Sequence, residues 1–380
     1  MTRWVGALLA ALACVAVLVD VERAPERPLA EQPFPDSAEY TSSASSLSHD
    51  KGFFTYIYHN SRQPPRYPPG YPMALSPFAA VGSYPRDVQR GAKFWAMVYV
   101  LVAVAAAWSL GGSLAALLAA IFIGVSPFAR VSAGLIMSDG YIATLTVLML
   151  PLLRYATRSG ARLAGTAAGF AMIVRLTAGV NFIALLATMP RRSYKGLVAF
   201  ALPSVIGLGV LQWLLFGSPL KTGYSYWGVS GHFFSLTYAT ASSVIRDGPF
   251  IFPDKLNGAL FNWTCPCRVG GPQDSMSNLA FYPALLASLY WIYSPPLVPL
   301  LGLFYAWRRR REAIARYALL VTALTFVVFL FYHFQGARFM SGPATLLLVL
   351  ASVWLAELAG RLWWALLRLL RRQFVTVDTA

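Results

Sequence analysis

The sequence has few charged residues, few cysteines and few histidines. Only 12% of its 380 residues are Asp, Glu, Lys or Arg, whereas soluble domains usually carry about 25%. Three cysteines and four histidines are spread along the chain, and Cys265 and Cys267 stand one residue apart, which is not the spacing of a zinc site. These shortages argue against soluble domains and against a structural zinc site, while a local disulfide between Cys265 and Cys267 stays open.

Alternating strand patterns are also lacking, and long apolar runs take their place. Hydrophobic residues make up 57% of the chain, in runs of roughly 15–25 residues that can each cross a membrane as a helix. We therefore expect an all-α polytopic membrane protein with about ten transmembrane helices, within a range of nine to eleven. The stretch 163–189 could be one span or a tight pair, because Arg175 interrupts it. The expected spans are 4–19, 94–110, 112–127, 141–156, 163–176, 177–189, 197–216, 288–307, 317–333 and 344–358.

The net charge of +16 would suit a nucleic-acid partner, but its distribution favours a membrane. The short loops on one side of the expected spans carry 16 of the 31 Lys and Arg and only three acids. The positive-inside rule makes that side cytoplasmic, together with both termini. Two large extracytoplasmic loops with short interfacial helices are then expected at 20–93 and 217–287, and a basic amphipathic cytoplasmic tail at 359–380. The expected partners are membrane lipids and not nucleic acid.

The first large loop holds most of the acidic residues, including Asp36 and Glu39. The sequence Asp36-Ser37-Ala38-Glu39-Tyr40 follows Pro35 and begins a segment with helical spacing. Asp36 stands where a helix N-cap belongs. A carboxylate in this place also suits a general base, so capping and catalysis are both open.

A proline-rich turn follows at Arg66-Tyr67-Pro68-Pro69-Gly70-Tyr71-Pro72. Three prolines in five residues exclude a helix interior and fix a stiff, irregular backbone. Tyr67 and Tyr71 present aromatic faces that suit a sugar or a lipid headgroup, although a plain loop before an interfacial helix would look the same.

Together these segments resemble the first external loop of the glycosyltransferase C (GT-C) superfamily, in the branch of protein O-mannosyltransferases and the aminoarabinose transferase of lipid A. Later segments of this chain resemble that family in the same order. They are Ser138-Asp139, Ile173-Val174-Arg175-Leu176-Thr177, Phe216-Gly217-Ser218-Pro219 with Gly223-Tyr224, and Ala337-Arg338-Phe339 with Pro343.

The resemblance implies a GT-C-like transmembrane domain over 1–358 that transfers a sugar, with inversion, from a polyprenyl-phosphate donor to an extracytoplasmic hydroxyl of a glycan, lipid or protein. Asp36 matches the catalytic aspartate of the family. Glu39 and Asp139 are candidates for catalytic support, although Ser37 stands where many members have Glu. The resemblance implies no obligatory cofactor; a divalent metal is open but not predicted. The expected location is the cytoplasmic membrane of a bacterium, with the active site outside.

A phosphate leaving group needs cations where negative charge develops. The expected phosphate ligands are Arg66, Arg338 and Lys221, and the expected pocket residues are Tyr40, His59, Tyr67, Tyr71 and Tyr224. The alternative function is a transporter or flippase of a lipid-linked substrate. The sequence shows no internal repeat and few charges inside the spans, which weakens that alternative.

Overall fold

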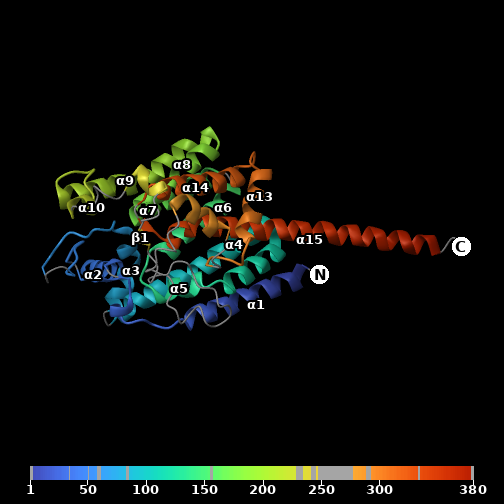
Figure 1. Cartoon of the computed structure of the whole chain (residues 1–380), viewed down its shortest axis with the longest axis horizontal. Coiled ribbons are helices and arrows are strands. Elements are labelled where there is room, and N and C mark those ends of the chain that lie inside the picture. The colour runs from blue at the N-terminus through green and yellow to red at the C-terminus, as the bar shows by residue number, and fades with distance from the viewer. Residues whose placement is uncertain are drawn as a thin grey trace.

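In the residues that the computed structural model describes, the protein is a bundle of helices with two very short strands (Figure 1). The structure describes residues 3–33, 35–49, 51–57, 61–82, 85–154, 157–227, 234–240, 245–246, 277–287, 292–332 and 334–377. The strands β1 (Ile245–Arg246) and β2 (Phe334–Gln335) pair in parallel. His59, Cys265 and Cys267, which entered the sequence analysis, lie outside the described residues.

The helices follow one another with short connections for most of the chain. They are α1 (Arg3–Glu22), α2 (Asp36–Ser48), α3 (Gly70–Val81), α4 (Arg86–Gly124), α5 (Phe128–Gly134), α6 (Asp139–Arg154), α7 (Arg158–Val174), α8 (Gly179–Thr188), α9 (Tyr194–Phe216), α10 (Gly223–Tyr226), α12 (Asn278–Leu286), α13 (Val298–Arg308), α14 (Ala313–Leu330) and α15 (Ser341–Val377). Short 3-10 turns lie at Leu29–Glu31, Leu176–Ala178, Arg191–Ser193, Leu236–Ala239 and Ala337–Met340.

Five stretches of the described chain are long and apolar enough to cross a membrane. They are Trp4–Glu22, Arg86–Gly124, Arg191–Phe216, Ala313–Leu330 and Arg338–Leu369. The 39-residue α4 is broken at Gly112, whose φ of 76° and ψ of −164° lie outside the helical region and need a residue without a side chain. The break falls where the sequence divides 94–110 from 112–127. The stretch 163–189 forms two helices, α7 and α8, which separate at Arg175. The total of about ten spans stays a prediction.

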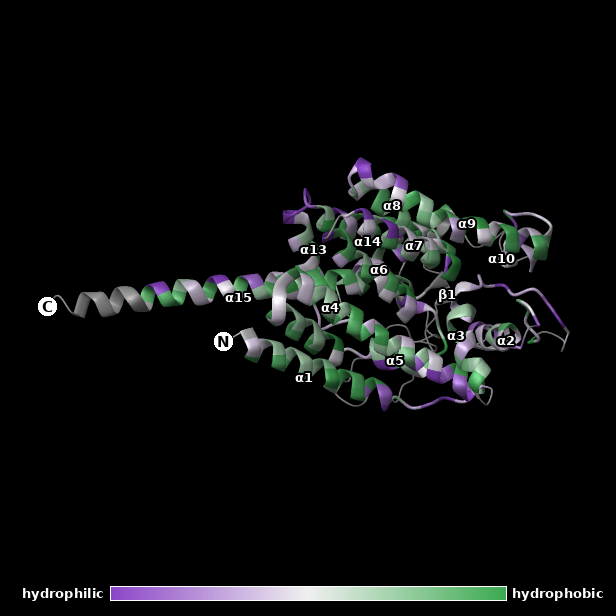
Figure 2. Ribbon diagram, turned by 180° about the vertical axis from the view of Figure 1, so that it is seen from behind, coloured by the Kyte–Doolittle hydropathy of each residue, from purple (hydrophilic) through white to green (hydrophobic). Residues whose placement is uncertain are grey.

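The bundle is elongated and its two ends differ (Figure 1). Helices α2, α3 and α10 lie at one end, called here the α2 end, and the N-terminus lies at the other, called the far end. Hydrophobic residues follow the length of the helices, and hydrophilic residues gather in the loops (Figure 2). Helix α15 continues from inside the bundle past the far end to the C-terminus. It has no break at residue 358, where the sequence analysis ends the membrane domain.

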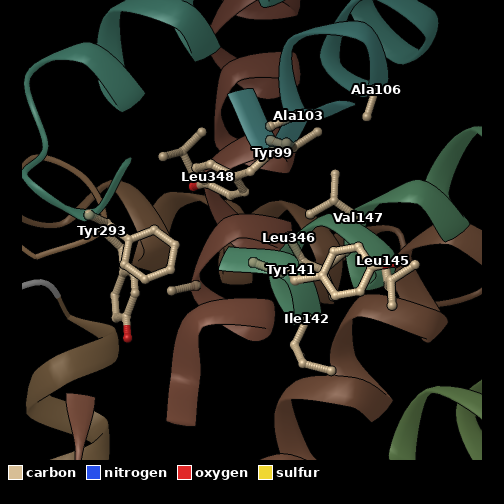
Figure 3. Close-up of a cluster of buried hydrophobic side chains, with 14 of the residues drawn as sticks. Tyr99, Ala103, Ala106, Tyr141, Ile142, Leu145, Val147, Tyr293, Leu346 and Leu348 are labelled. Atoms are coloured by element: carbon tan, nitrogen blue, oxygen red, sulfur yellow. The ribbon is translucent and has the colours of Figure 1, made fainter. Parts of the chain in front are cut away.

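Small residues allow the helices to approach closely. Close packing of this kind is usual in membranes, where lipid tails are as apolar as the side chains and the hydrophobic effect does not drive helices together. A Cβ on Gly302 of α13 would lie 1.9 Å from the Leu347 carbonyl oxygen of α15, so only glycine fits there. Tyr99 of α4 bonds Thr345 of α15 through their hydroxyls at 3.2 Å, deep in the core. Side chains of α4, α6 and α15 meet around this point (Figure 3); they include Tyr99, Ala103, Ala106, Ile142, Leu145, Val147, Leu346 and Leu348.

Candidate active site

Asp36 opens helix α2 and has two partners from distant parts of the chain. Arg338 donates from Nη1 to Oδ2 of Asp36 at 2.9 Å, across a separation of 302 residues. The Tyr67 hydroxyl donates to the other carboxylate oxygen, Oδ1. The N-cap prediction for Asp36 is wrong, because the cap position belongs to Pro35 and no side chain caps the helix. The carboxylate instead accepts hydrogen bonds from a guanidinium and a phenol.

Glu39 lies one turn further along α2 and is buried, with 1% of its surface exposed. Its Oε1 accepts the backbone N–H of Tyr67 at 2.9 Å and also the backbone N–H of Arg66. Burial raises the pKa of Glu39 to about 7, although these two N–H donors and the Arg66 charge act in the opposite direction. The Glu39 carboxylate holds the backbone of the proline-rich turn and thereby places the Tyr67 side chain beside Asp36.

Two glycines fix the other contacts of the turn. A Cβ on Gly70 would lie 2.6 Å from the backbone nitrogen of Val174, so the start of α3 packs directly on the end of α7. A Cβ on Gly223 would lie 2.3 Å from the Pro65 carbonyl oxygen. Both distances are too short for a Cβ atom, so neither position can carry a side chain. They explain why glycine stands at these positions of the sequence segments Tyr-Pro-Pro-Gly and Gly-Tyr.

A second buried ion pair lies beside the first. Arg175 donates from Nη2 to Asp139 Oδ1 at 2.8 Å and to Ser138 Oγ at 3.0 Å. Ser138 Oγ also contacts the Tyr40 hydroxyl at 3.4 Å. The side chains of Asp139 and Arg175 are 5% and 19% exposed. Asp139 therefore anchors a cation, and Arg175 is a site residue that the sequence analysis treats only as an interruption of an apolar stretch and as part of a family segment.

Aromatic rings join the two ion pairs. The guanidinium groups of Arg338 and Arg175 lie 5.2 and 5.8 Å from the ring centre of Phe339. Tyr40 packs against Tyr67 at 4.9 Å and against Tyr71 at 5.1 Å between ring centres, and Tyr67 packs against Tyr224 at 5.6 Å. The structure thus brings together four of the five predicted pocket residues; the fifth, His59, lies outside the described residues.

The three predicted phosphate ligands have different surroundings. Arg338 contacts Asp36 directly. Arg66 lies in the proline-rich turn, with its guanidinium 5.9 Å from the Tyr67 ring centre. Lys221 is exposed, and its ammonium lies 5.8 Å from the ring centre of Tyr226, on α10. Within the described chain, Arg338 and Arg66 belong to the cluster around Asp36, whereas the contact of Lys221 is with α10.

Narrow pockets lie on two sides of this cluster. The first is mainly apolar and runs between the proline-rich turn and α9; its walls include Arg66, Tyr67, Leu208, Leu211, Leu215 and Tyr224. The second lies against α5 and includes Pro33, Phe128, Met137, Asp139 and Arg338. Asp36 contacts one wall residue of each pocket, Tyr67 and Arg338. The carboxylate therefore stands at the boundary between the two.

Metal binding needs several His, Cys, Asp or Glu side chains close together. No three such side chains meet within the ranges that the structure describes. Asp36, Glu39 and Asp139 are instead each engaged with Arg side chains or backbone N–H groups. The absence of an obligatory metal stays a prediction.

Comparisons with known proteins find similarity in structure and not in sequence. No family model and no curated protein sequence matches the chain. The structure of ArnT from Cupriavidus metallidurans bound to undecaprenyl phosphate matches with a TM-score of 0.59 at 16% identity, over 93% of this chain. The oligosaccharyltransferase of Archaeoglobus fulgidus matches in the apo form with a TM-score of 0.58 at 13% identity, over 97% of this chain. Both are GT-C superfamily members.

This chain has the GT-C fold. The predicted helical architecture is confirmed for the described residues, and five of their stretches are long and apolar enough to cross a membrane. The archaeal oligosaccharyltransferase AglB also matches in a complex with an inhibitory peptide and a dolichol-phosphate, with a TM-score of 0.54 at 13% identity over 96% of this chain. The chain spans only 60% of the length of ArnT and 52% of that of AglB.

Proposed function

We propose that the protein is a membrane glycosyltransferase that transfers a sugar from a polyprenyl-phosphate donor to an acceptor hydroxyl, with inversion at the anomeric carbon. The observation that carries the proposal is the position of Asp36 between the Tyr67 hydroxyl and the Arg338 guanidinium. The GT-C fold supports it, because matched structures hold undecaprenyl phosphate and a dolichol-phosphate.

Asp36 is the proposed general base. The acceptor oxygen attacks the anomeric carbon, the bond from that carbon to the phosphate oxygen breaks, and the acceptor proton passes to the Asp36 carboxylate. Attack opposite to the leaving phosphate inverts the anomeric carbon. This geometry requires acceptor and phosphate on opposite sides of the sugar, which suits a carboxylate at the boundary between two pockets.

The leaving phosphate gains negative charge, and guanidinium groups stabilise such charge well because they donate in a fixed fork. Arg338 is the first proposed ligand. It now contacts Asp36, and an arriving phosphate would compete for it and release the carboxylate to accept a proton. Arg175, held by Asp139 beside the same Phe339 ring, adds a second fixed positive charge. Arg66 lines the apolar pocket beside Tyr67 and is the third.

The polyprenyl chain is proposed to lie along α9, beside the narrow apolar pocket, whose volume of about 20 Å³ is itself too small to hold the chain. Leu208, Leu211 and Leu215 of α9 form its wall, and Arg66 and Tyr67 stand at the same pocket. The outer face of α9 carries exposed apolar side chains such as Trp213 and Leu214, as expected for a helix in contact with lipid. A chain of isoprene units could therefore enter from the bilayer and keep its phosphate near Asp36.

The α2 end is proposed to face the extracytoplasmic side, with both termini in the cytoplasm of a bacterium. The cytoplasmic assignment follows from the Arg-rich loops, which include Arg308 to Arg311 between α13 and α14.

The experiment is a transfer assay with the purified full-length protein in liposomes. Polyprenyl phosphates carrying different radiolabelled sugars are supplied together with extracts of the cell envelope as acceptor. Label is expected to move from one donor into an acceptor fraction, with release of free polyprenyl phosphate. If the protein instead carries an intact lipid-linked sugar across the bilayer without breaking its bond to phosphate, the transporter alternative is correct and this proposal fails.

A further inference from the structure

A basic cleft lies at the far end of the bundle, away from α2. It consists of two adjoining hollows that share Arg309, of about 250 Å³ and 580 Å³. A water molecule occupies about 30 Å³ of liquid, so the cleft has room for a ligand much larger than water. Its charged walls are Arg154, Arg309, Arg361, Arg368, Glu312 and Glu357.

The two acids of the cleft are engaged by its own residues. Glu357 accepts from the Tyr305 hydroxyl at 2.9 Å and from Arg309 Nη2 at 3.0 Å, and Arg361 lies 3.8 Å away. Glu312 lies 3.6 Å from Arg309. Four guanidinium groups against two carboxylates leave two positive charges in excess. The cleft is therefore suited to an anion with one or two negative charges.

Arg154 and Arg368 supply the cations that the acids do not engage. Arg154 donates one N–H to the Ser109 carbonyl oxygen, and a guanidinium carries five N–H donors in all. Arg368 lies on the exposed part of α15, at the outer hollow. Neither side chain forms an ion pair within the described part of the chain. Their fork geometry matches the oxygens of a phosphate group.

Apolar side chains complete the cleft. Leu110, Leu350 and Val353 line its inner hollow, and Trp364 lines the outer one. Trp364 is 61% exposed and lies on α15. Tryptophan prefers the depth of lipid headgroups. A ligand with a phosphate at one end and apolar chains at the other would satisfy both kinds of wall.

We infer that this cleft binds the phosphate headgroup of an anionic phospholipid, at the face of the membrane opposite to Asp36. The excess positive charge selects against zwitterionic lipids, and the apolar walls select against soluble phosphate. A lipid bound here would brace α15 against the ends of α6 and α13, since Arg154, Arg309 and Arg368 come from or adjoin these helices.

The test measures lipid-dependent stability of the purified full-length protein. The midpoint of thermal unfolding is followed in detergent while dioleoylphosphatidylglycerol is added, in parallel with dioleoylphosphatidylcholine and with inorganic phosphate. Phosphatidylglycerol is expected to raise the midpoint with saturation, and the other two are not. In the double variant R154Q/R368Q the half-saturating concentration is expected to rise about tenfold or more, because two charge-assisted hydrogen bonds are lost.

The matched control is R310Q/R311Q, which removes the same charge from the neighbouring loop outside the cleft and is expected to change the half-saturating concentration less than about threefold. Equal weakening in both double variants would overturn the inference, since attraction would then be general. Equal stabilisation by phosphatidylcholine or by inorganic phosphate would also overturn it. If R154Q/R368Q does not fold, R154K/R368K keeps the charge, and its lost fork geometry is still expected to weaken lipid binding.

Discussion

The two ends of the bundle use the same residue types in different surroundings. At the α2 end, the side chains of the pairs Arg338–Asp36 and Arg175–Asp139 are between 5% and 19% exposed. At the far end, those of the Arg309–Glu357 and Arg361–Glu357 pairs are between 29% and 77% exposed. Burial strengthens a charge interaction and fixes its geometry, whereas water screens an exposed one. The same residue types therefore form buried ion pairs with fixed geometry at the α2 end and exposed, screened ion pairs at the far end.

The largest difference between the two ends is expected in the free energy of unfolding, when the arginine of one ion pair at each end is removed. Arg175→Gln leaves the Asp139 carboxylate buried without its cation, which costs about 3 kcal/mol or more. Arg309→Gln at the far end leaves Glu357 half-exposed, and is expected to cost about 1 kcal/mol or less. Free energies of unfolding, from denaturant titrations in mixed micelles, check this. Equal losses would show that the two ends do not differ as described.

The next effect is the change with pH in the free energy of unfolding that Glu39 causes. Its folded pKa of about 7 lies above the usual 4.5, so the folded protein binds more protons than the unfolded chain between these values. Stability from this group is therefore greatest at low pH and falls as the pH rises to about 7. The free energy of unfolding of the wild type, relative to Glu39→Gln, is expected to fall by roughly 1 to 3 kcal/mol between pH 5 and pH 8. A constant difference over that range would contradict the burial of Glu39.

A smaller loss is expected from a single methyl group at the proline-rich turn. Gly70→Ala forces a Cβ against the backbone of Val174 and is expected to destabilise the protein by about 2 kcal/mol. Gly207→Ala on α9 is the control, because a Cβ there meets no atom within 4 Å. Thermal unfolding midpoints of the two variants should differ clearly. Matching midpoints would mean that the turn does not pack on α7 as closely as described.

The smallest effect is expected at Lys221. It is exposed and lies over the Tyr226 ring, so Lys221→Ala should change stability by less than about 0.5 kcal/mol and the transfer rate by less than about threefold. Arg338→Ala, in the same transfer assay, provides the contrasting large loss. If Lys221→Ala lowered the transfer rate as much as Arg338→Ala does, Lys221 would be a phosphate ligand, as the sequence predicts.

The sequence predicts the helical membrane fold well, because an apolar run long enough to cross the hydrocarbon core indicates a helix surrounded by lipid. Gly112 stands at the break in α4, where its φ of 76° favours a residue without a side chain. Arg175 marks the division of 163–189, since a charged residue is poorly suited to the middle of a span. The choice of Asp36 and Arg338 as site residues rests on motifs in a fixed order. Local pattern alone favours an N-cap for Asp36.

The partners of the buried charges could not be read from the sequence. Glu39 is buried by contact with a backbone 27 and 28 residues away, and helical spacing within α2 carries no sign of that contact. Arg175 is held in the site by its ion pair with Asp139, the first residue of a different helix. Such pairs form only when helices pack, so periodicity cannot reveal them. A charged residue inside a segment that resembles the family, as at Arg175, is the signal that could have indicated this ion pair.

The most direct test of the proposed site compares wild type with Asp36→Asn, using a labelled polyprenyl-phosphate sugar that the wild type consumes. Asn keeps the shape of the side chain but cannot accept the acceptor proton. Single-turnover transfer is expected to fall by about 100-fold or more while the variant still folds and binds the donor. The thermal unfolding midpoint is expected to fall as well, because Asn leaves the Arg338 guanidinium without its carboxylate partner. Transfer at the wild-type rate by a folded, donor-bound Asp36→Asn variant would contradict the assignment of Asp36 as the base.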